Sequence, residues 1–582
     1  MESSSAKPLA DPYKTLCEDV KTFITSFYQH IKTNNLVEIE NDYAVKFPKL
    51  TEQYFKSTRW PAVEIIAPLV NKDPWFMMLY NELYYRHLYA HVSSFPDFEE
   101  AHQSYVNYCA FFEALIKPKK PVILELPNQW LWDIVDEFIY QFQKFSISRT
   151  KSKRKPEDEA FLRQNPKTWS IHGVLNILFQ LVEKSNINAQ LNCYAAQRDP
   201  NEVAGTFGRV YLYKMLGFFS LVGLCRVHCL LGDYYTALKM LENVIFSRQE
   251  MYHEVPTCHI TTGYYVGFAY MMMRRFQDAI RTFSSTLTYI SRASGFVSQR
   301  QDLRDYVVKQ SDQMTSLLAI CFTINPMPID QSVEQQLREK YAESLNRLQQ
   351  TNKDEFTMCF DMGCPRFVNP DSANDRSEYS LDAQRHQGYV FREELENLLD
   401  LPRLRSYLKL YTTLPVSKLS MFLREPMSPK CPFQCLFADM KSHNCFYLLI
   451  LHILCIWFHL LHDVILSYFS SHCSHSCSQK DENVVHSQLM RFKHLLKNVT
   501  TTRETCGSLE GKRQLLCDTD FYVDGDMIHI ADMKVDRRFS DFFMLQLEKL
   551  HEASHLTGIV FFRLVVISLP HEPDLDLGAT FY

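Results

Sequence analysis

The stretch FYVDGDMIHIADMKV, residues 521–535, decides the fold class of this chain. Two β-prone runs, 521–523 and 527–530, flank a turn at Asp524 and Gly525. Glycine tolerates the positive φ that such turns demand, so the pattern predicts a β-hairpin. Almost all of the chain before it has helical periodicity. One late hairpin in a helical chain indicates a helix-turn-helix with a β wing at the end of a helical array, which is typical of assembly proteins and rare in enzymes.

The composition is that of a globular protein with ample core. Of the 582 residues, 46% are hydrophobic and 22% are charged. The chain has only 16 Gly but 31 Tyr and 41 Phe, which favours packed aromatic helices over the glycine-rich loops of nucleotide-binding enzymes. The net charge of −5 gives no general reason to expect nucleic-acid binding.

The N-terminal sequence MESSSAKPLADPYK lacks the apolar run of a secretory signal. Without an export signal, we expect the 17 Cys to be mostly reduced thiols. The sequence therefore predicts a cytoplasmic protein.

A long amphipathic helix is predicted over residues 128–142, with Asn128 as its N-cap. The basic stretch SISRTKSKRKPEDEA, residues 146–160, is predicted to be an exposed linker. The helix has apolar residues at the offsets of one buried face: Leu131, Ile134, Val135, Phe138, Ile139 and Phe142.

Two segments, 224–244 and 266–286, resemble each other as helical hairpins. Each has a tight polar turn and a small residue in its second helix, Ala237 in one and Ala279 in the other. The two alanines are 42 residues apart, whereas a regular tetratricopeptide repeat has about 34. We therefore expect degenerate tetratricopeptide-like repeats that stack into a solenoid.

The C-terminal part has the pattern of a winged helix over residues 405–535. One helix is expected to end near Tyr411, and Pro415 stands at the start of the next. Residues 484–498 then supply a recognition-type helix, and the hairpin supplies the wing. The predicted fold is mostly α: a tetratricopeptide-like helical-hairpin solenoid followed by a winged helix with a small β-hairpin wing.

An insert at about 425–482 interrupts this pattern, and a tail at 552–582 also loses helical patterning. Within the insert, residues 445–462 are uncharged and apolar, which leaves open a membrane-tethered adaptor as an alternative. A zinc site is the other alternative. Its candidate ligands are Cys431, Cys435, Cys473, Cys477, His472 and His475.

Several long blocks resemble the subunit L family of eukaryotic translation initiation factor 3. They are ELPNQWLWDIVDEFIYQFQ (125–143), SLVGLCRVHCLLGDYYTAL (220–238), YYVGFAYMMMRRFQDAI (264–280), LKLYTTLPVSKL (408–419) and DFYVDGDMIHIADMKV (520–535). The resemblance covers about residues 12–424 and 483–551, and not the insert or the tail.

The resemblance implies a PCI-type protein that works as a non-enzymatic subunit of initiation factor 3. Its implied partners are subunits K and E and the small ribosomal subunit, and its implied role is mRNA recruitment. The implied domains are an N-terminal helical region (1–150), helical repeats (151–275), a PCI-type region (276–551) and the tail. A PCI subunit of the proteasome lid or signalosome type is the alternative with the same architecture.

No catalytic, cofactor or metal site is predicted. Asp133, Asp136 and Glu137 lie opposite the apolar stripe of their helix, so we interpret them as a solvated face. His87 and His91 have the i, i+4 spacing of zinc ligands, but the Glu of an H-E-x-x-H motif is missing between them.

Weak RNA contact or subunit contact is predicted for basic residues in two places. The linker contributes Lys151, Lys153, Arg154 and Lys155. The winged-helix region contributes the candidate interface residues Lys418, Arg491, Lys493, Lys497, Arg537 and Arg538.

Overall fold

The computed structural model divides into two compact units. The N-terminal unit comprises Met1–Arg403 with Lys497–Gln514, and the C-terminal unit comprises Leu404–Leu496 with Leu515–Tyr582. This is a division by compactness, so the domain limits expected at 150, 275 and 551 stay predictions. The structure describes residues 16–92, 96–150, 155–244, 255–297, 301–369, 383–399, 401–423, 482–496, 499–500, 509, 511–513 and 519–532.

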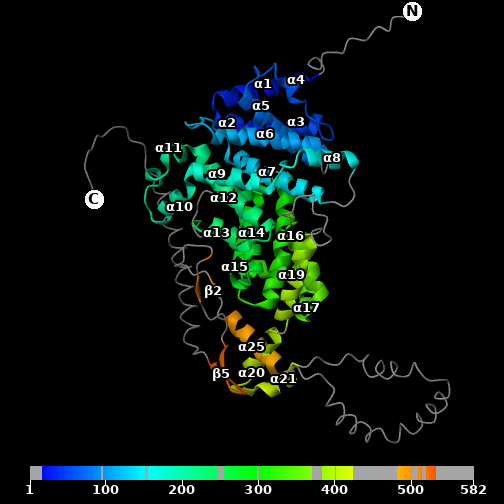
Figure 1. The fold of residues 1–582 in the computed structure, drawn as a ribbon, viewed down its shortest axis with the longest axis vertical. Helices are drawn as coiled ribbons and strands as arrows, with labels where there is room; N and C mark the ends of the chain where they lie inside the picture. Colours follow the sequence, from blue (N-terminus) through cyan, green and yellow to red (C-terminus); the bar gives the residue numbers. More distant parts are fainter. Residues whose placement is uncertain are drawn as a thin grey trace, which may run out of the picture. The chain divides into compact units, whose positions relative to one another are not determined.

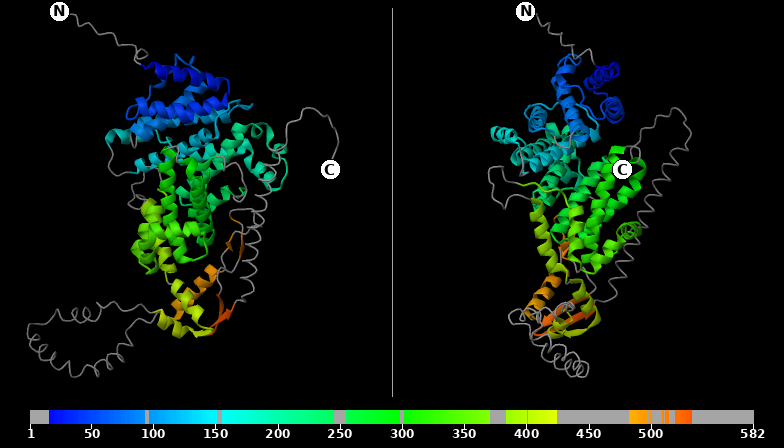
Figure 2. Two further views of the ribbon diagram at one scale, coloured as in Figure 1. Left: turned by 180° about the vertical axis from the view of Figure 1, so that it is seen from behind. Right: turned by 90° about the vertical axis from the view of Figure 1, so that its right-hand side faces the viewer.

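The described part of the N-terminal unit is almost entirely helical, with its first helices at one end and α14–α19 toward the other (Figures 1 and 2). A two-stranded antiparallel sheet, β2 (Val499–Thr500) with β3 (Lys512–Arg513), belongs to the same unit. The helices are α1 (Glu18–Lys32), α2 (Leu36–Asn41), η2 (Asp42–Lys46), α3 (Phe47–Tyr54), α4 (Val63–Ile66), α5 (Pro74–His87), η3 (Leu88–Val92), α6 (Phe98–Ile116), α7 (Asn128–Arg149), α8 (Pro156–Gln164), α9 (Ile171–Ser185), α10 (Ile187–Ala195), η4 (Pro200–Glu202), α11 (Gly205–Gly208), α12 (Tyr211–Leu230), α13 (Tyr234–Met240), α14 (Pro256–Met272), α15 (Phe276–Val297), α16 (Gln301–Ile324), α17 (Gln331–Gln349), α18 (Lys353–Gly363) and α19 (Ala383–Leu398).

Aromatic side chains join the first helices to α7. The Trp130 ring stacks on Tyr43 at 5.0 Å between centres and on Phe27 at 5.6 Å. Further along α7, Phe138 packs 5.3 Å from Trp169, which precedes α9. Large rings bury much apolar area and add a favourable pair geometry, so α7 forms the centre of this core.

The predicted helix at 128–142 is confirmed as α7, and the six residues of its apolar stripe are all buried. Two details of the prediction are wrong. Pro127 occupies the N-cap position and Asn128 is the first helical residue. The helix also continues to Arg149 with Ser146 and Ser148 buried, so the exposed linker cannot begin at residue 146. Neighbouring helices bury this polar end of α7, which local periodicity does not reveal.

The two predicted helical hairpins are present as α12–α13 and α14–α15. Ala237 and Ala279 are both fully buried, as expected for small residues where helices approach closely. In the second hairpin, Gly267 lies so close to Phe283 that an added Cβ would come within 2.4 Å of its ring. Gly232, in the turn between α12 and α13, has φ of +81°, which favours glycine.

Residues 369–387 are polar and helical periodicity resumes only at Glu393, which predicts no helix before that point, whereas α19 begins at Ala383. A polar contact explains the difference. Tyr234, at the start of α13, donates a 2.7 Å hydrogen bond to the side-chain oxygen of Gln387 on α19. The polar residues at the start of α19 therefore face another hairpin of the same unit, and their polarity does not mark a loop.

The described part of the C-terminal unit has three helices and a three-stranded antiparallel sheet. The sheet order is β1–β5–β4, so the last strand lies in the middle. Its elements are α20 (Leu401–Leu410, which belongs to this unit from Leu404 on), β1 (Thr413–Pro415), α21 (Val416–Phe422), α25 (Glu482–Leu496), β4 (Thr519–Asp524) and β5 (Met527–Asp532).

The hairpin and the helices around it are confirmed, with two differences. Asp524 pairs with Met527, so the two turn residues are Gly525 and Asp526, one position later than predicted. Gly525 has φ of +56°, the conformation for which glycine was expected. The short strand β1, predicted as a turn, pairs with β5 through Leu414 and Ile528. Three residues are too few for β periodicity to be visible in a sequence.

Candidate interaction surfaces

Two of the predicted interface lysines contact side chains or backbone of the C-terminal unit itself. Lys493, on α25, donates a 2.7 Å hydrogen bond to the carbonyl oxygen of Phe521 on β4. The ammonium of Lys418, on α21, lies 5.3 Å from the centre of the Tyr411 ring and 5.8 Å from that of Phe422. The Lys493 contact is a charge-assisted hydrogen bond between α25 and β4, and the Lys418 contacts are cation–π contacts within α21 and with the residue that follows α20.

The other four predicted residues do not form one described patch. Arg491 is an exposed residue of α25, on the same helix as Lys493. Lys497, Arg537 and Arg538 lie outside the described residues. The interface role of all six therefore stays a prediction.

The outer face of the sheet was not singled out from the sequence. The side chains of Asp520, Tyr522 and Asp524 alternate with the buried Phe521 on β4, so these three share the side away from the core. Tyr522 pairs with His529 across the hairpin, and their rings stack at 4.9 Å with 14° between planes. The turn position fixes the register of a hairpin, and the turn predicted one position early would pair Tyr522 with Met527, so the sequence did not bring the two rings together.

A charged network lies between α5, η2 and α7, where the sequence predicted a solvated face. Arg86 forms an ion pair with Glu82 and lies 3.6 Å from an oxygen of Asp133. Tyr43 donates a hydrogen bond to the same Asp133 carboxylate. Burial raises the pKa of the Asp133 carboxyl, against the opposing effect of Arg86. The solvated-face interpretation of Asp133 is therefore wrong.

Glu137 and Asp136 are also engaged inside the protein. Gln141 donates a 3.0 Å hydrogen bond to Glu137, and burial raises the pKa of the Glu137 carboxyl to about 7. Asp136 forms an ion pair with Arg226 of α12, whose side chain is only 9% exposed. Charges buried in this way need partners, so the acidic side of α7 is an interface between helices.

His87 is not arranged as a zinc ligand. Its Nε2 lies 2.8 Å from the carbonyl oxygen of Thr58, and its ring stacks on His91 at 5.1 Å. A hydrogen bond to a carbonyl requires a protonated Nε2, so only Nδ1 could bind a metal, and among the described residues the one group of three potential ligands does not include His87. Burial lowers the pKa of His87, so the neutral ring is favoured.

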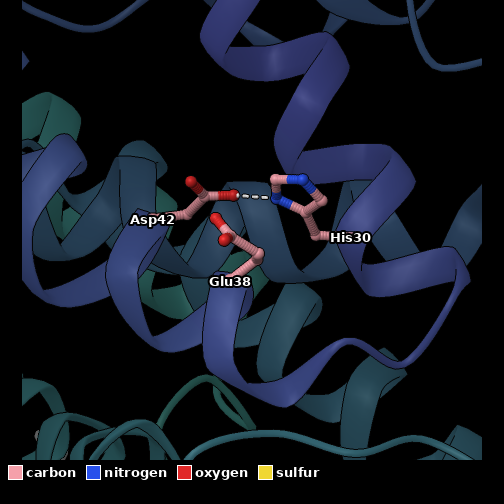
Figure 3. A group of neighbouring side chains, drawn as sticks. All are labelled: His30, Glu38 and Asp42. Carbon is pink, nitrogen blue, oxygen red and sulfur yellow. Dashed lines mark hydrogen bonds and ion pairs between the residues drawn. The ribbon is translucent and has the colours of Figure 1, made fainter.

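Among the described residues, one group has its potential ligand atoms within 4.8 Å of one another: His30, Glu38 and Asp42 (Figure 3). His30 is hydrogen-bonded to the buried Asp42 at 2.6 Å. The ammonium of Lys46 lies 2.6 Å from the other Asp42 oxygen and 4.0 Å from Glu38. Because Lys46 already supplies a cation to both carboxylates, ion pairing accounts for this group.

The zinc and membrane alternatives concern residues 425–482, of which the structure describes only the last, where α25 begins. Lys151, Lys153 and Arg154 of the basic linker are outside the described residues as well, whereas Lys155 is exposed before α8. One described helix, α12, is long and apolar enough to cross a membrane. However, 89% of its apolar window is buried in the protein, which is typical of a core helix.

Comparison with known proteins identifies the family. The family model of RNA polymerase I-associated factor PAF67 matches residues 100–550. Eukaryotic translation initiation factor 3 subunit L of Nematostella vectensis is 45% identical over 539 residues, which cover 92% of each chain. The chain belongs to the initiation factor 3 subunit L family.

Other members of this family are similarly close. The subunit L protein of Aedes aegypti is 44% identical over 93% of each chain. The human subunit L protein is 44% identical over 88% of this chain and 81% of its own. The resemblance seen in the sequence blocks is thus confirmed over most of the chain.

Proposed function

We propose that this chain is a non-catalytic scaffold subunit of eukaryotic translation initiation factor 3. In this role it supports assembly of the factor on the small ribosomal subunit and mRNA recruitment, in the cytoplasm. The observation that carries the proposal is the similarity to the Nematostella subunit L protein, 45% identity over 92% of both chains. Similarity along the full length favours a shared architecture and role over a single borrowed domain.

We further propose that the fold is of the PCI type, with tetratricopeptide-like hairpins leading into a winged helix. The order of the C-terminal unit supports this: α20, β1, α21, α25 and then the β4–β5 hairpin. Helix, turn and helix form the first half of a winged helix, α25 stands where a recognition helix stands, and the hairpin is the wing.

The scaffold acts through surface complementarity, and no bond is made or broken. The residues considered as catalytic or zinc-binding candidates support this, because each contacts another residue of the protein. These contacts are Asp133 with Tyr43, Asp136 with Arg226 and His87 with Thr58. Subunits K and E are the proposed neighbours. The relatives' names favour initiation factor 3 over a proteasome lid or signalosome subunit.

The test is affinity purification of the tagged full-length chain from cytosol, followed by mass spectrometry. A variant that lacks residues 426–480 is treated in the same way. Recovery of initiation factor 3 subunits and the small ribosomal subunit by both chains supports the scaffold. Recovery by the deletion alone means that the insert blocks assembly. Recovery by neither chain overturns the proposal, and retention in membranes after carbonate extraction favours the tethered adaptor.

A further inference from the structure

The outer face of the three-stranded sheet carries a stacked aromatic pair, Tyr522 and His529. Tyr522 is 54% exposed although it lies in the middle of β4. Its ring is held parallel to that of His529 on β5, and the register places Thr413 of β1 on the other side of His529. The stacked rings form a rigid platform, since both side chains are fixed by their strands and by each other.

Negatively charged residues lie near the platform. The hairpin residues whose side chains the structure describes, 520–530, include three aspartates, at 520, 524 and 526, and no Lys or Arg. Asp524 and Asp526 are both exposed. Two residues along a strand span about 6.6 Å, so Asp524 stands within reach of a group that lies over Tyr522. Phosphate groups are repelled here, whereas cations are attracted.

Lys493 of α25 contacts β4 from the other side of the sheet. The ammonium of Lys493 hydrogen-bonds to the carbonyl of Phe521 and lies 5.5 Å from the centre of the Phe521 ring. Phe521 is buried and its side chain points to the face opposite Tyr522. The aromatic face and its carboxylates are therefore not neutralised by Lys493.

We propose that this face binds a basic segment of a neighbouring protein subunit, with an arginine side chain over Tyr522. A planar guanidinium stacks on an aromatic ring and pairs with a carboxylate at the same time, which the ring of Tyr522 and the carboxylate of Asp524 together permit. Charge complementarity selects a basic protein segment over RNA. The inference rests on the proposed scaffold function and names the chemistry of one of its partners.

The experiment places a photo-cross-linker at the platform of the full-length chain. Tyr522 is replaced by p-benzoylphenylalanine in eukaryotic cells, the chain is cross-linked and purified, and the attached peptide is sequenced. We expect an adduct with another protein, in a segment rich in Arg and Lys. An adduct with RNA, with an acidic or apolar segment, or with this chain's own residues overturns the proposal, as does the lack of any adduct.

Charge reversal tests the role of the carboxylates. Asp524→Lys with Asp526→Lys is expected to lower the yield of the adduct by about tenfold or more, since attraction becomes repulsion. The matched control is Glu40→Lys with Glu157→Lys, two exposed carboxylates of α2 and α8 that receive the same change in charge. Equal yields from both double variants overturn the proposal.

The same purification separates this inference from the proposed function. If the cross-linker variant recovers initiation factor 3 subunits but gives no basic adduct, the scaffold stands and only the arginine-binding face fails. If no initiation factor subunit is recovered, the scaffold itself fails.

Discussion

The ammonium group of Lys493 on α25 donates a hydrogen bond of 2.7 Å to the carbonyl oxygen of Phe521 on β4. The two residues are 28 positions apart, and their contact ties the third helix of the C-terminal unit to its hairpin. The rings of Phe492 and Phe521 stack beside it at 6.1 Å, so an apolar and a polar contact act at the same place. A lysine predicted to contact a partner therefore has a structural role inside the unit.

Replacing Lys493 by Met is expected to destabilise the C-terminal unit. The apolar stem is kept, whereas a charge-assisted hydrogen bond to the Phe521 carbonyl is lost, at a cost of about 1–2 kcal/mol. Hydrogen exchange of the β4 and β5 amides should then be about tenfold faster. Lys409→Met, at an exposed position of α20, is the control and should leave exchange unchanged. Unchanged exchange in Lys493→Met would show that the bond is not formed in solution.

Breaking the ion pair between Asp136 and Arg226 is expected to destabilise the N-terminal unit strongly. Asp136→Ala leaves the guanidinium of Arg226 buried between α7 and α12 without its carboxylate, which typically costs about 3 kcal/mol or more. The double variant Asp136→Leu with Arg226→Met removes both charges and should recover most of this loss. Calorimetric melting of all three chains measures it, and equal melting of the single variant and the unchanged chain contradicts the prediction.

Two glycines on helices are expected to respond to alanine with opposite signs. In Gly267→Ala, the new Cβ meets the Phe283 ring at 2.4 Å, so α14 and α15 must separate and stability falls by about 1–3 kcal/mol. In Gly388→Ala on α19, nothing lies within 4 Å of the new Cβ. Stability there should rise by about 0.5–1 kcal/mol. Thermal unfolding of both variants checks this, and a loss of the same size at both positions would contradict it.

Glu137 makes stability depend on pH. Burial raises the pKa of its carboxyl to about 7 in the folded protein, above the 4.5 of an exposed glutamate. Its contribution to stability is therefore full below pH 4.5 and is lost as pH rises through 7. Glu137→Gln keeps the side chain neutral and should raise the free energy of unfolding at pH 8 by roughly 1–3 kcal/mol.

The advantage of Glu137→Gln should shrink as pH falls below 7 and disappear below about 4.5, because the native carboxyl is then protonated as well. Glu157→Gln, at an exposed position of α8, is the matched control and should show no such trend. A gain in stability for Glu137→Gln that is the same at pH 4.5 and pH 8 contradicts the pKa assignment.

The elements that local patterns specify were predictable from the sequence. Three kinds of element illustrate this: the apolar stripe of α7, the polar turns of the two helical hairpins and the turn of the β4–β5 hairpin. Each of them spans no more than about 20 consecutive residues. Periodicity and turn chemistry act over this range, so they report on these elements directly. The strand β1 was not predicted, because it is only three residues long and forms its hydrogen bonds with β5, more than 100 positions away in the sequence.

The sequence by itself determined that the chain is mostly helical, that a hairpin turns at Gly525 to within one residue, and the family to which the chain belongs. Tertiary structure alone decided the surroundings of its charges. Asp136 looks solvated on a helix viewed in isolation, yet its partner Arg226 comes from a helix 90 positions later. Lys493 likewise looks available to a partner until Phe521 is placed beside it. Periodicity records which side of a helix is apolar, whereas burial of the polar side depends on which distant elements pack there.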